Sequence, residues 1–202
     1  MKAIIQTIPS RLELAKKQRD ALGTDCDIYV DEAMSGPFKG FHGSLMAHDY
    51  GSEYRLHMQD DLIYADNFKD YFPEVERLMR ENDMHLLSLY APRYKTLKAA
   101  RDKGRRFCRS FAGFAMQCIV FSPSFVQQML ELAPYYTYSP HDDWFVSEAV
   151  RATKIKPYVH LPSLCQHNVF EIRSSMGHPT SIRRTSEIFE PDFVNKWKSA
   201  RV

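Results

Sequence analysis

The pattern that decides the fold lies in residues 3–31, AIIQTIPSRLELAKKQRDALGTDCDIYVD. Residues 3–7 form a short apolar stretch that predicts a strand. Residues 12–22 carry apolar side chains at helical spacing and predict a helix. Gly23 is placed to end that helix, and residues 27–31 predict a second strand. A strand, a helix and a strand in succession predict a crossover between parallel neighbours in one sheet.

The same alternation continues along the chain. Further strands are expected over residues 54–58, 84–90, 116–122 and 157–161, and helices over residues 66–81, 124–132 and 141–151. Residues 35–43 hold three glycines and a proline and predict an irregular loop. The strongly basic residues 94–109 predict a surface loop or a short helix. We therefore expect one α/β, Rossmann-like domain over residues 1–202, with a mostly parallel central sheet flanked by helices.

Composition narrows the class of protein. The chain has 202 residues, of which 44% are hydrophobic, enough for one domain with a buried core. Its apolar stretches, such as residues 116–121, are far shorter than the roughly 20 residues that a membrane helix needs. The opening residues MKAIIQT lack the apolar core and cleavage site of a signal peptide. We expect a cytoplasmic protein that has no membrane partner.

Charge and cysteine content say little more about the class of protein. The formal net charge of +2 permits contact with a polyanion but does not demand it. The four cysteines are scattered, with no Cys-x-x-Cys pair, so we expect them to be reduced and structural.

Two adjacent carboxylates stand at the end of a predicted strand. Gln59-Asp60-Asp61 directly follows residues 54–58. Open α/β sheets bind ligands at the carboxyl ends of their strands, and adjacent carboxylates there call for a divalent cation or a sugar hydroxyl. A solvated turn or a helix cap is the structural alternative. The position at the rim of the sheet favours a binding site.

A second acidic pair opens a predicted helix. The sequence there is His141-Asp142-Asp143-Trp144. One aspartate can cap the helix, but both cannot, so one carboxylate is left over. Beside a histidine and a tryptophan, the spare carboxylate of Asp142 or Asp143 is a candidate general base for an acceptor hydroxyl. Trp144 is a candidate acceptor contact.

A histidine follows the last predicted strand. His167 lies in residues 161–168, LPSLCQHN. A neutral imidazole can complete a metal site that carboxylates and a diphosphate have begun, and Mn²⁺ tolerates such mixed ligands; a structural histidine is the alternative. Behind it, residues 172–187 contain the hydroxyl, glycine and arginine groups that hold phosphates, although flexible tails share that composition.

The order of these motifs resembles the metal-dependent glycosyltransferases of the GT-A fold, in particular compact enzymes of the kind that bacterial viruses encode. The first strand with residues 7–11, TIPSR, looks like their nucleotide-binding opening, which implies donor-binding roles for its polar and cyclic residues Thr7, Pro9, Ser10 and Arg11. Gln59-Asp60-Asp61 looks like their DxD motif, with Gln59 at the first acidic position. The resemblance implies that Asp61 binds the metal and that Gln59 or Asp60 contacts the donor's ribose or sugar.

The resemblance continues towards the C-terminus. Asp142-Asp143 falls where the family has an acidic residue that faces the acceptor. Residues 162–167, PSLCQH, are similar to the segment with the family's second metal ligand, which implies that role for His167. Residues 174–177, SSMG, then resemble a phosphate-contacting loop, with Ser174, Ser175 and Gly177 as donor contacts. By this resemblance residues 168–202 form a C-terminal tail that closes the donor site.

The resemblance implies the transfer of a hexose or pentose from a nucleotide-diphosphate sugar, such as a UDP-sugar, to an acceptor hydroxyl. The cofactor it implies is Mn²⁺ or Mg²⁺. The acceptor is a glycan or a hydroxymethylated pyrimidine in DNA, and the basic residues 95–109 offer Arg105, Arg106 and Arg109 as contacts to a polyanion. A solvated basic loop explains the same residues without such a role.

Two other functions compete with glycosyl transfer. A sugar nucleotidyltransferase normally has a glycine-rich, basic phosphate loop after its first strand, but residues 7–11 contain no glycine. A non-enzymatic nucleic-acid-binding module would use the basic residues, but it leaves both carboxylate pairs unexplained, because acids along a binding groove repel phosphates.

Overall fold

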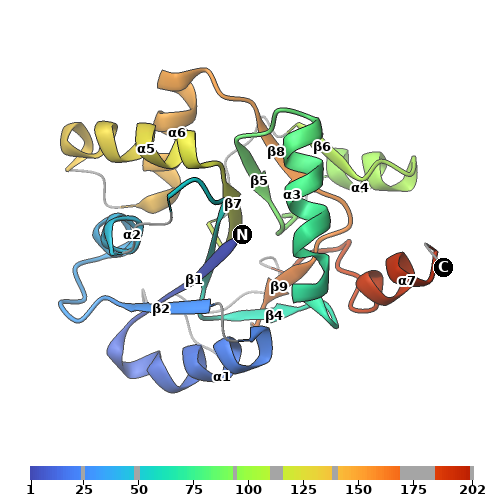
Figure 1. Ribbon diagram of the computed structural model, residues 1–202, viewed down its shortest axis with the longest axis horizontal. Helices are drawn as coiled ribbons and strands as arrows, with labels where there is room; N and C mark the ends of the chain where they lie inside the picture. Colours follow the sequence, from blue (N-terminus) through green and yellow to red (C-terminus); the bar gives the residue numbers. More distant parts are fainter. Residues whose placement is uncertain are drawn as a thin grey trace.

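The computed structural model describes residues 1–23, 26–47, 51–92, 95–109, 116–137, 141–168 and 185–200. Its centre is a seven-stranded sheet in the order β2-β1-β3-β7-β5-β8-β6 (Figure 1). The strands are β1 Lys2–Thr7, β2 Cys26–Val30, β3 Arg55–Gln59, β5 Leu86–Ser88, β6 Phe107–Arg109, β7 Cys118–Phe121 and β8 Pro157–His160.

Most strands of the sheet run in one direction. β1 is parallel to both β2 and β3, and β5 is parallel to β8. β7 is antiparallel to both β3 and β5, so β3 and β5 share one direction, while β6 is antiparallel to β8. Five of the seven strands therefore point the same way, which confirms the predicted α/β class with a mostly parallel sheet.

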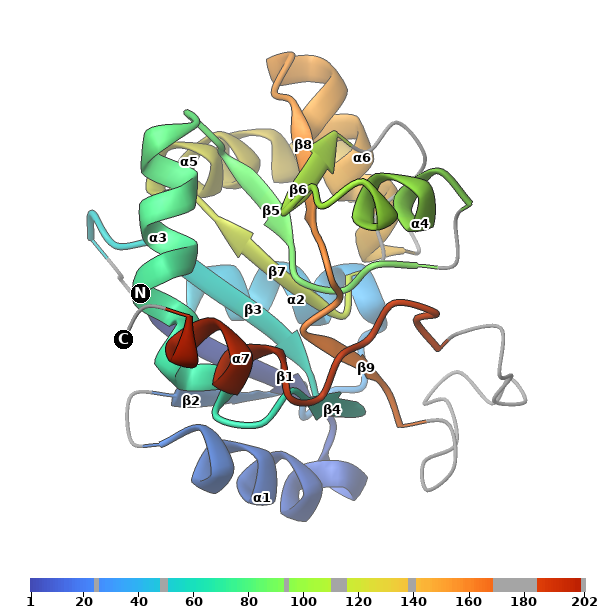
Figure 2. The same cartoon turned by 90° about the vertical axis from the view of Figure 1, so that its right-hand side faces the viewer.

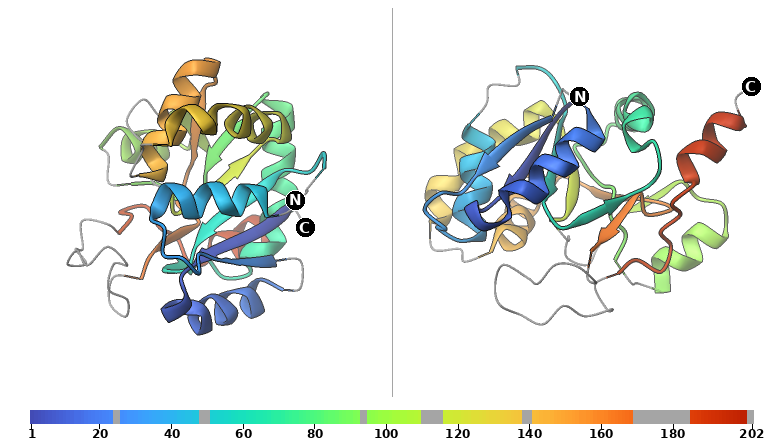
Figure 3. Two further views of the ribbon diagram at one scale, coloured as in Figure 1. Left: turned by 90° about the vertical axis from the view of Figure 1, so that its left-hand side faces the viewer. Right: turned by 90° about the horizontal axis from the view of Figure 1, so that it is seen from below.

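Helices cover both faces of the sheet. The α1 helix Leu12–Leu22, α3 Phe72–Glu81 and α7 Phe193–Ser199 bury apolar side chains with Ile5 and Met58 on one face. The α2 helix Pro37–Met46, α5 Pro123–Leu132 and α6 Asp142–Thr153 pack an aromatic core on the other (Figure 3). The α4 helix Lys95–Asp102 lies beside β6. Three short 3₁₀ turns are η1 Pro9–Arg11, η2 Phe68–Tyr71 and η3 Ala133–Tyr136.

A small second sheet joins two distant segments. β4 Leu62–Tyr64 pairs antiparallel with β9 Cys165–His167, so that Leu62 lies opposite His167 (Figure 2). This pairing was not predicted, because each strand is only three residues long and the two are far apart in the sequence. It fixes the chain after Asp61 against the chain around His167.

The predicted loop over residues 35–43 is wrong, because most of it belongs to α2. Phe38, Phe41 and Leu45 recur at helical spacing and are buried. The glycines that suggested a loop permit close packing instead. A Cβ at Gly40 would lie 2.6 Å from Nε2 of Gln6, and one at Gly43 would lie 2.0 Å from the hydroxyl of Tyr29.

Other boundaries also differ from expectation. Of the strand predicted over residues 84–90, the structure forms only Leu86–Ser88. The basic residues 94–109 contain the expected short helix but also the edge strand β6. Part of the predicted C-terminal tail is a packed helix, since Val194 is fully buried and the ring centroids of Trp197 and Tyr71 are 4.8 Å apart.

Within the described residues, none of the helices is both long enough and apolar enough to span a bilayer. Cys26, Cys118 and Cys165 are buried, Cys108 is partly buried, and none of the four forms a disulfide in the described part of the chain.

Candidate functional site

A pocket forms where β1, β2 and β3 end. Because these three strands are parallel, the residues that follow them meet at one edge of the sheet, and the N-termini of α2 and α6 lie against the same space. The pocket has a volume of about 150 Å³ and is partly open to solvent. The described residues that line it are Gln6, Thr7, Ile8, Arg11, Asp31, Met34, Gly36, Pro37, Gln59, Asp60, Asp61 and Asp142.

Both oxygens of the Asp60 carboxylate are held by the chain after β1. The Thr7 hydroxyl donates a hydrogen bond to Oδ2, and Nη1 of Arg11 lies 3.0 Å from Oδ1. Burial raises the pKa of Asp60 to about 6, although Arg11 and the Thr7 hydrogen bond act in the opposite direction. Asp60 is therefore suited to orienting Thr7 and Arg11 rather than to binding a cation.

Asp61 keeps one oxygen available. Its Oδ2 lies 3.5 Å from Nδ1 of His167 and 3.5 Å from Nη2 of Arg11. Its Oδ1 is buried and has no hydrogen-bond partner among the described residues. Burial raises the pKa of Asp61, but the hydrogen bonds and charges of His167 and Arg11 outweigh it and leave the pKa below its usual value. The carboxylate is ionised at neutral pH.

The paired strands β4 and β9 bring His167 to Asp61. His167 lies opposite Leu62 in the ladder, and the amide of Asn168 donates to the carbonyl of Asp61 over 2.8 Å. His167 is buried and its ring packs against Tyr90. His167 is not among the residues that line the pocket, so it reaches the site through Asp61.

These two side chains fit a cation that shares its coordination with a ligand. Among the described residues, no group of three or more His, Cys, Asp or Glu side chains could hold a metal ion alone. Mg²⁺ is typically bound through one or two carboxylates together with substrate phosphates and water, and Mn²⁺ accepts an imidazole as well. The unpartnered Oδ1 of Asp61 is the feature that fits such an ion.

Arg11 is placed to contact an anion at the same spot. Its Nε atom is buried and has no hydrogen-bond partner within the described part of the chain, whereas its Nη2 forms an ion pair with Asp61. A guanidinium with free donors is a common phosphate contact. Gln59 also lines the pocket, whereas Pro9 and Ser10 are exposed and do not. The predicted donor contacts Ser174, Ser175 and Gly177 lie outside the described residues.

Asp142 supplies another buried carboxylate with an unused oxygen. It is the first residue of α6, after the N-cap His141. Its Oδ1 accepts the amide of Asp143 over 2.9 Å, and its buried Oδ2 accepts no hydrogen bond from the residues that the structure describes. Burial raises the pKa of Asp142 to about 6, the amide of Asp143 opposes this, and the Asp143 charge adds to it. At neutral pH the group is ionised and available as a base.

The structure separates the two members of this acidic pair. Asp143 does not line the pocket, and its Oδ1 accepts the amide of Trp144 over 2.8 Å. Trp144 is 63% exposed and contacts the ring of His141 at a centroid distance of 5.5 Å. Of the two candidate bases, only Asp142 reaches the pocket.

The basic residues lie elsewhere. β6 and β2 are the two edges of the sheet, so Arg105 and Arg109 are far from the strands that form the pocket (Figure 2). Neither residue lines the pocket, and both are exposed. Their predicted contacts to a polyanionic acceptor remain a prediction.

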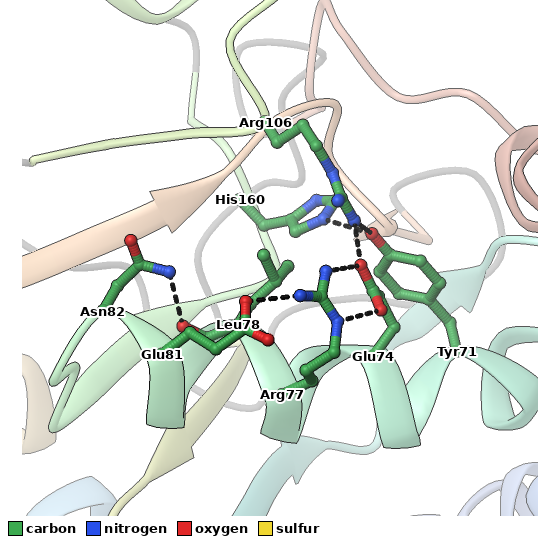
Figure 4. A network of polar contacts seen from close by, with 8 residues as sticks. All are labelled: Tyr71, Glu74, Arg77, Leu78, Glu81, Asn82, Arg106 and His160. Carbon is green, nitrogen blue, oxygen red and sulfur yellow. Dashed lines mark hydrogen bonds and ion pairs between the residues drawn. The ribbon is translucent and has the colours of Figure 1, made fainter.

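Arg106 has a structural partner instead (Figure 4). Its Nη2 lies 2.6 Å from Oε1 of Glu74 and donates to the hydroxyl of Tyr71 over 2.7 Å. Arg77 binds the same Glu74 carboxylate, and the Tyr71 hydroxyl lies 3.1 Å from Nε2 of His160. This network joins α3 to the chain around β6 and β8, so the structure does not bring Arg106 to the pocket.

The C-terminal residues that can be placed do not close the pocket. Residues 185–200 contribute none of its lining, and their helix α7 packs on Tyr71 through Phe193 and Trp197. The closing role of residues 168–202 stays a prediction, because residues 169–184 lie outside the described part of the chain.

Several pocket residues were not anticipated from the sequence. Asp31 follows β2 as Asp60 follows β3, and that shared position was a signal that could have identified it. Both Asp31 oxygens are bound by Ser35, whose amide and hydroxyl each donate over 2.8 Å. Gln6, Met34, Gly36 and Pro37 carry no motif, and the last two lie in residues 35–43, which were predicted as a loop.

The fold and the pocket define an α/β domain with a carboxylate-rich pocket at the carboxyl edge of its sheet. No family model and no curated protein sequence matches this chain. Among solved structures, the chain is similar to the inositol-1-phosphate CTP transferase from T. maritima, with a TM-score of 0.49 and 11% sequence identity. The match covers 91% of this chain and 75% of that one.

Proposed function

We propose that this protein is a glycosyltransferase that moves a sugar from a nucleotide-diphosphate sugar to an acceptor hydroxyl with the help of a divalent cation. The observation that supports this best is the presence, at one pocket, of two carboxylates that each keep a buried oxygen with no hydrogen-bond partner among the described residues. Asp61 has an imidazole beside it, and Asp142 lies at the start of a helix. Their surroundings suit two different tasks.

The first task is to hold the leaving diphosphate. In this proposal Asp61 and His167 bind Mn²⁺ or Mg²⁺, which when bound neutralises charge on the diphosphate as the sugar–phosphate bond breaks. Arg11 donates to a phosphate oxygen through Nε, which has no hydrogen-bond partner among the described residues. Asp60 holds Arg11 and Thr7 in place. The donor is a nucleotide sugar such as a UDP-sugar.

The second task is to handle the acceptor. Oδ2 of Asp142 accepts a hydrogen bond from the acceptor hydroxyl. In an inverting transfer it takes the proton while the acceptor oxygen bonds to the anomeric carbon and the bond from that carbon to the diphosphate breaks. In a retaining transfer it orients the hydroxyl. A pKa of about 6 keeps the carboxylate ionised yet basic enough for either role.

The charge of the pocket favours a glycan acceptor over DNA. Among the described residues that line it, four are aspartates, Asp31, Asp60, Asp61 and Asp142, and the one with a positive charge is Arg11, which is paired with two of them. A phosphodiester polymer brought to this pocket meets repulsion that a neutral sugar does not. A direct assay with hydroxymethylated DNA tests the other acceptor and can exclude it.

Two observations weigh against the competing functions. After β1 the chain turns into a 3₁₀ helix at Pro9–Arg11, with no glycine-rich loop of the type that nucleotidyltransferases use. A nucleic-acid-binding module would use basic residues, but Lys98, Arg101 and Arg106 are paired with Asp102, Glu190 and Glu74.

Turnover of a donor panel tests the proposal. The protein is incubated with Mn²⁺ and UDP-, GDP- or ADP-sugars, with neutral glycans or with DNA containing hydroxymethylated cytosine, and released nucleoside diphosphate is measured. We expect release with at least one donor that increases when a glycan is added and is lost in Asp61→Asn. Release of pyrophosphate from a sugar phosphate and a nucleoside triphosphate would instead identify a nucleotidyltransferase.

A further inference from the structure

One pocket side chain outside every motif is held in a defined orientation. Gln6 is the penultimate residue of β1 and lines the pocket. Its Oε1 lies 3.0 Å from Nε2 of His57, a fully buried residue of the neighbouring strand β3. Resting on the nucleotide-binding role proposed above, we propose that Gln6 reads the base of the bound nucleotide by donating its Nε2–H to a ring carbonyl, and that His57 is the positioning residue that fixes this orientation.

The tautomer of His57 decides which end of Gln6 faces the pocket. Burial, with the nearby charge of Arg55, lowers the pKa of His57 to about 3, so the ring is neutral and carries one N–H. Its Nδ1 is buried and has no hydrogen-bond partner among the described residues. Buried N–H groups without an acceptor are rarer than acceptors without a donor. The proton therefore sits on Nε2 and is donated to Oε1 of Gln6.

The rest of the site holds this pair in place. The ring of Phe41 meets the His57 ring edge-on, with centroids 4.9 Å apart and planes at 88°, which restricts rotation of the imidazole. On the other side, α2 passes so close that a Cβ at Gly40 would lie 2.6 Å from Nε2 of Gln6 and 3.2 Å from Oδ2 of Asp31. The absence of a side chain at residue 40 leaves room for the amide.

The remaining donor is unusual in this pocket. With Oε1 occupied, Nε2 of Gln6 has no hydrogen-bond partner within the described residues, while the carboxylates around it offer only acceptors. Met34 and Pro37 provide apolar surface in the same pocket for a flat ring, and Arg11 is the group suited to phosphate. An uncharged amide donor matches a base that carries a ring carbonyl, as uracil and guanine do and adenine does not.

Affinities for UDP, GDP and ADP in the presence of Mn²⁺ test this role. We compare wild type, Gln6→Glu, which replaces the amide donor with a carboxylate acceptor, and Gly40→Ala, which displaces the amide without altering its chemistry. The quantity compared is the affinity for UDP or GDP, whichever binds more tightly, divided by the affinity for ADP. This ratio should fall by about tenfold in both variants, because each loses one specific hydrogen bond. Lys39→Ala, an exposed residue of the same helix, should leave it unchanged.

Failure of the proposed function and failure of the role of Gln6 give different results. If the wild-type protein binds no nucleotide with Mn²⁺, the proposed function and the role of Gln6 are both overturned. If the wild type binds and Asp61→Asn does not, but Gln6→Glu and Gly40→Ala keep the wild-type preference, only the role of Gln6 is overturned.

The role of His57 has its own readouts. His57→Gln keeps an N–H donor within reach of Gln6, whereas His57→Met removes it, so the base preference should survive in the first and fall as in Gln6→Glu in the second. Long-range ¹H–¹⁵N spectra of the wild-type protein should show His57 protonated on Nε2, a result that needs no variant to fold. Protonation on Nδ1, or an unchanged preference in folded His57→Met, would contradict the assignment.

Discussion

Nδ1 of His167 lies 3.5 Å from Oδ2 of Asp61, and the contact exists because β9 pairs antiparallel with β4. Asp61 follows a strand of the main sheet, whereas His167 arrives from the segment after β8. The short ladder of β4 and β9 sets the distance between these two side chains, and no other acidic residue is needed to set it. The candidate cation site is thus a product of a six-residue sheet rather than of one local motif.

Replacing the two aspartates at the start of α6 should have different effects. Asp142→Asn removes the carboxylate whose free oxygen lies in the pocket, so turnover should fall by roughly 10²–10⁴, the range for a lost general base. Asp143→Asn alters a carboxylate outside the pocket and should change turnover by less than about threefold. Steady-state rates with nucleotide affinities measured in parallel check this, and equal losses in both variants would refute the assignment.

The rate should depend on pH through Asp142. Its pKa is raised to about 6, so the base is protonated below that pH and ionised above it. We expect kcat/KM to rise with pH and to level off above about pH 7. Because the pKa of Asp60 is also raised to about 6, the profile of Asp60→Asn is needed as well. A profile that stays flat from about pH 5 to 8 in both proteins would rule out a base of this kind.

The buried carboxylate of Asp142 should lower the free energy of unfolding at neutral pH. A carboxyl group whose pKa is raised in the folded state lowers the free energy of unfolding at any pH above that pKa. This loss of stability disappears as the pH falls towards the pKa that the group has in the unfolded chain. Asp142→Asn should therefore raise the free energy of unfolding at about pH 7.5 by at most about 3 kcal/mol, corresponding to about two pKa units. Near about pH 4 most of the gain should be gone.

Urea unfolding of both proteins at the two pH values measures this difference. A variant that is less stable than wild type at the higher pH would show that the Asp142 carboxylate has a stabilising partner.

Arg106 should matter for stability rather than for binding. Its guanidinium joins the buried Glu74 carboxylate and the Tyr71 hydroxyl (Figure 4), so Arg106→Ala leaves part of a buried network unpaired. We expect a loss of about 1–3 kcal/mol in the free energy of unfolding and unchanged nucleotide affinity. Arg105→Ala, at an exposed neighbouring position, serves as the matched comparison.

Chemical unfolding and DNA-binding titrations of the two arginine variants separate the roles. Loss of DNA binding in Arg106→Ala with unchanged stability would restore the acceptor role that its position in the basic stretch suggested.

The strand–helix–strand start of the fold was predictable from the sequence because its signals are local. Apolar spacing in residues 12–22, the end at Gly23 and the short apolar strands all report on neighbouring residues, and α1 has the expected bounds Leu12–Leu22. α2 was missed because glycine usually marks a turn, whereas Gly40 and Gly43 are used where other side chains approach the helix. That information exists only once β1 and β2 are placed beside α2.

The candidate site was predictable in part for the same reason. Asp60 and Asp61 could be placed at the carboxyl edge because they directly follow a strand. Their contact with His167 depends on a three-residue pairing between distant segments, which no periodicity reveals. Gln6 gave no signal at all, since its neighbour His57 lies on another strand and only the parallel register brings them together.

Calorimetric titration of UDP and GDP into the protein, with and without Mn²⁺, and into His167→Ala, tests the cation–diphosphate site most directly. We predict binding that requires Mn²⁺ and weakens by about 10–100-fold without His167, the usual range for loss of a metal-site group. Binding of equal strength with and without Mn²⁺, or equal in wild type and His167→Ala, would contradict the site formed by Asp61 and His167.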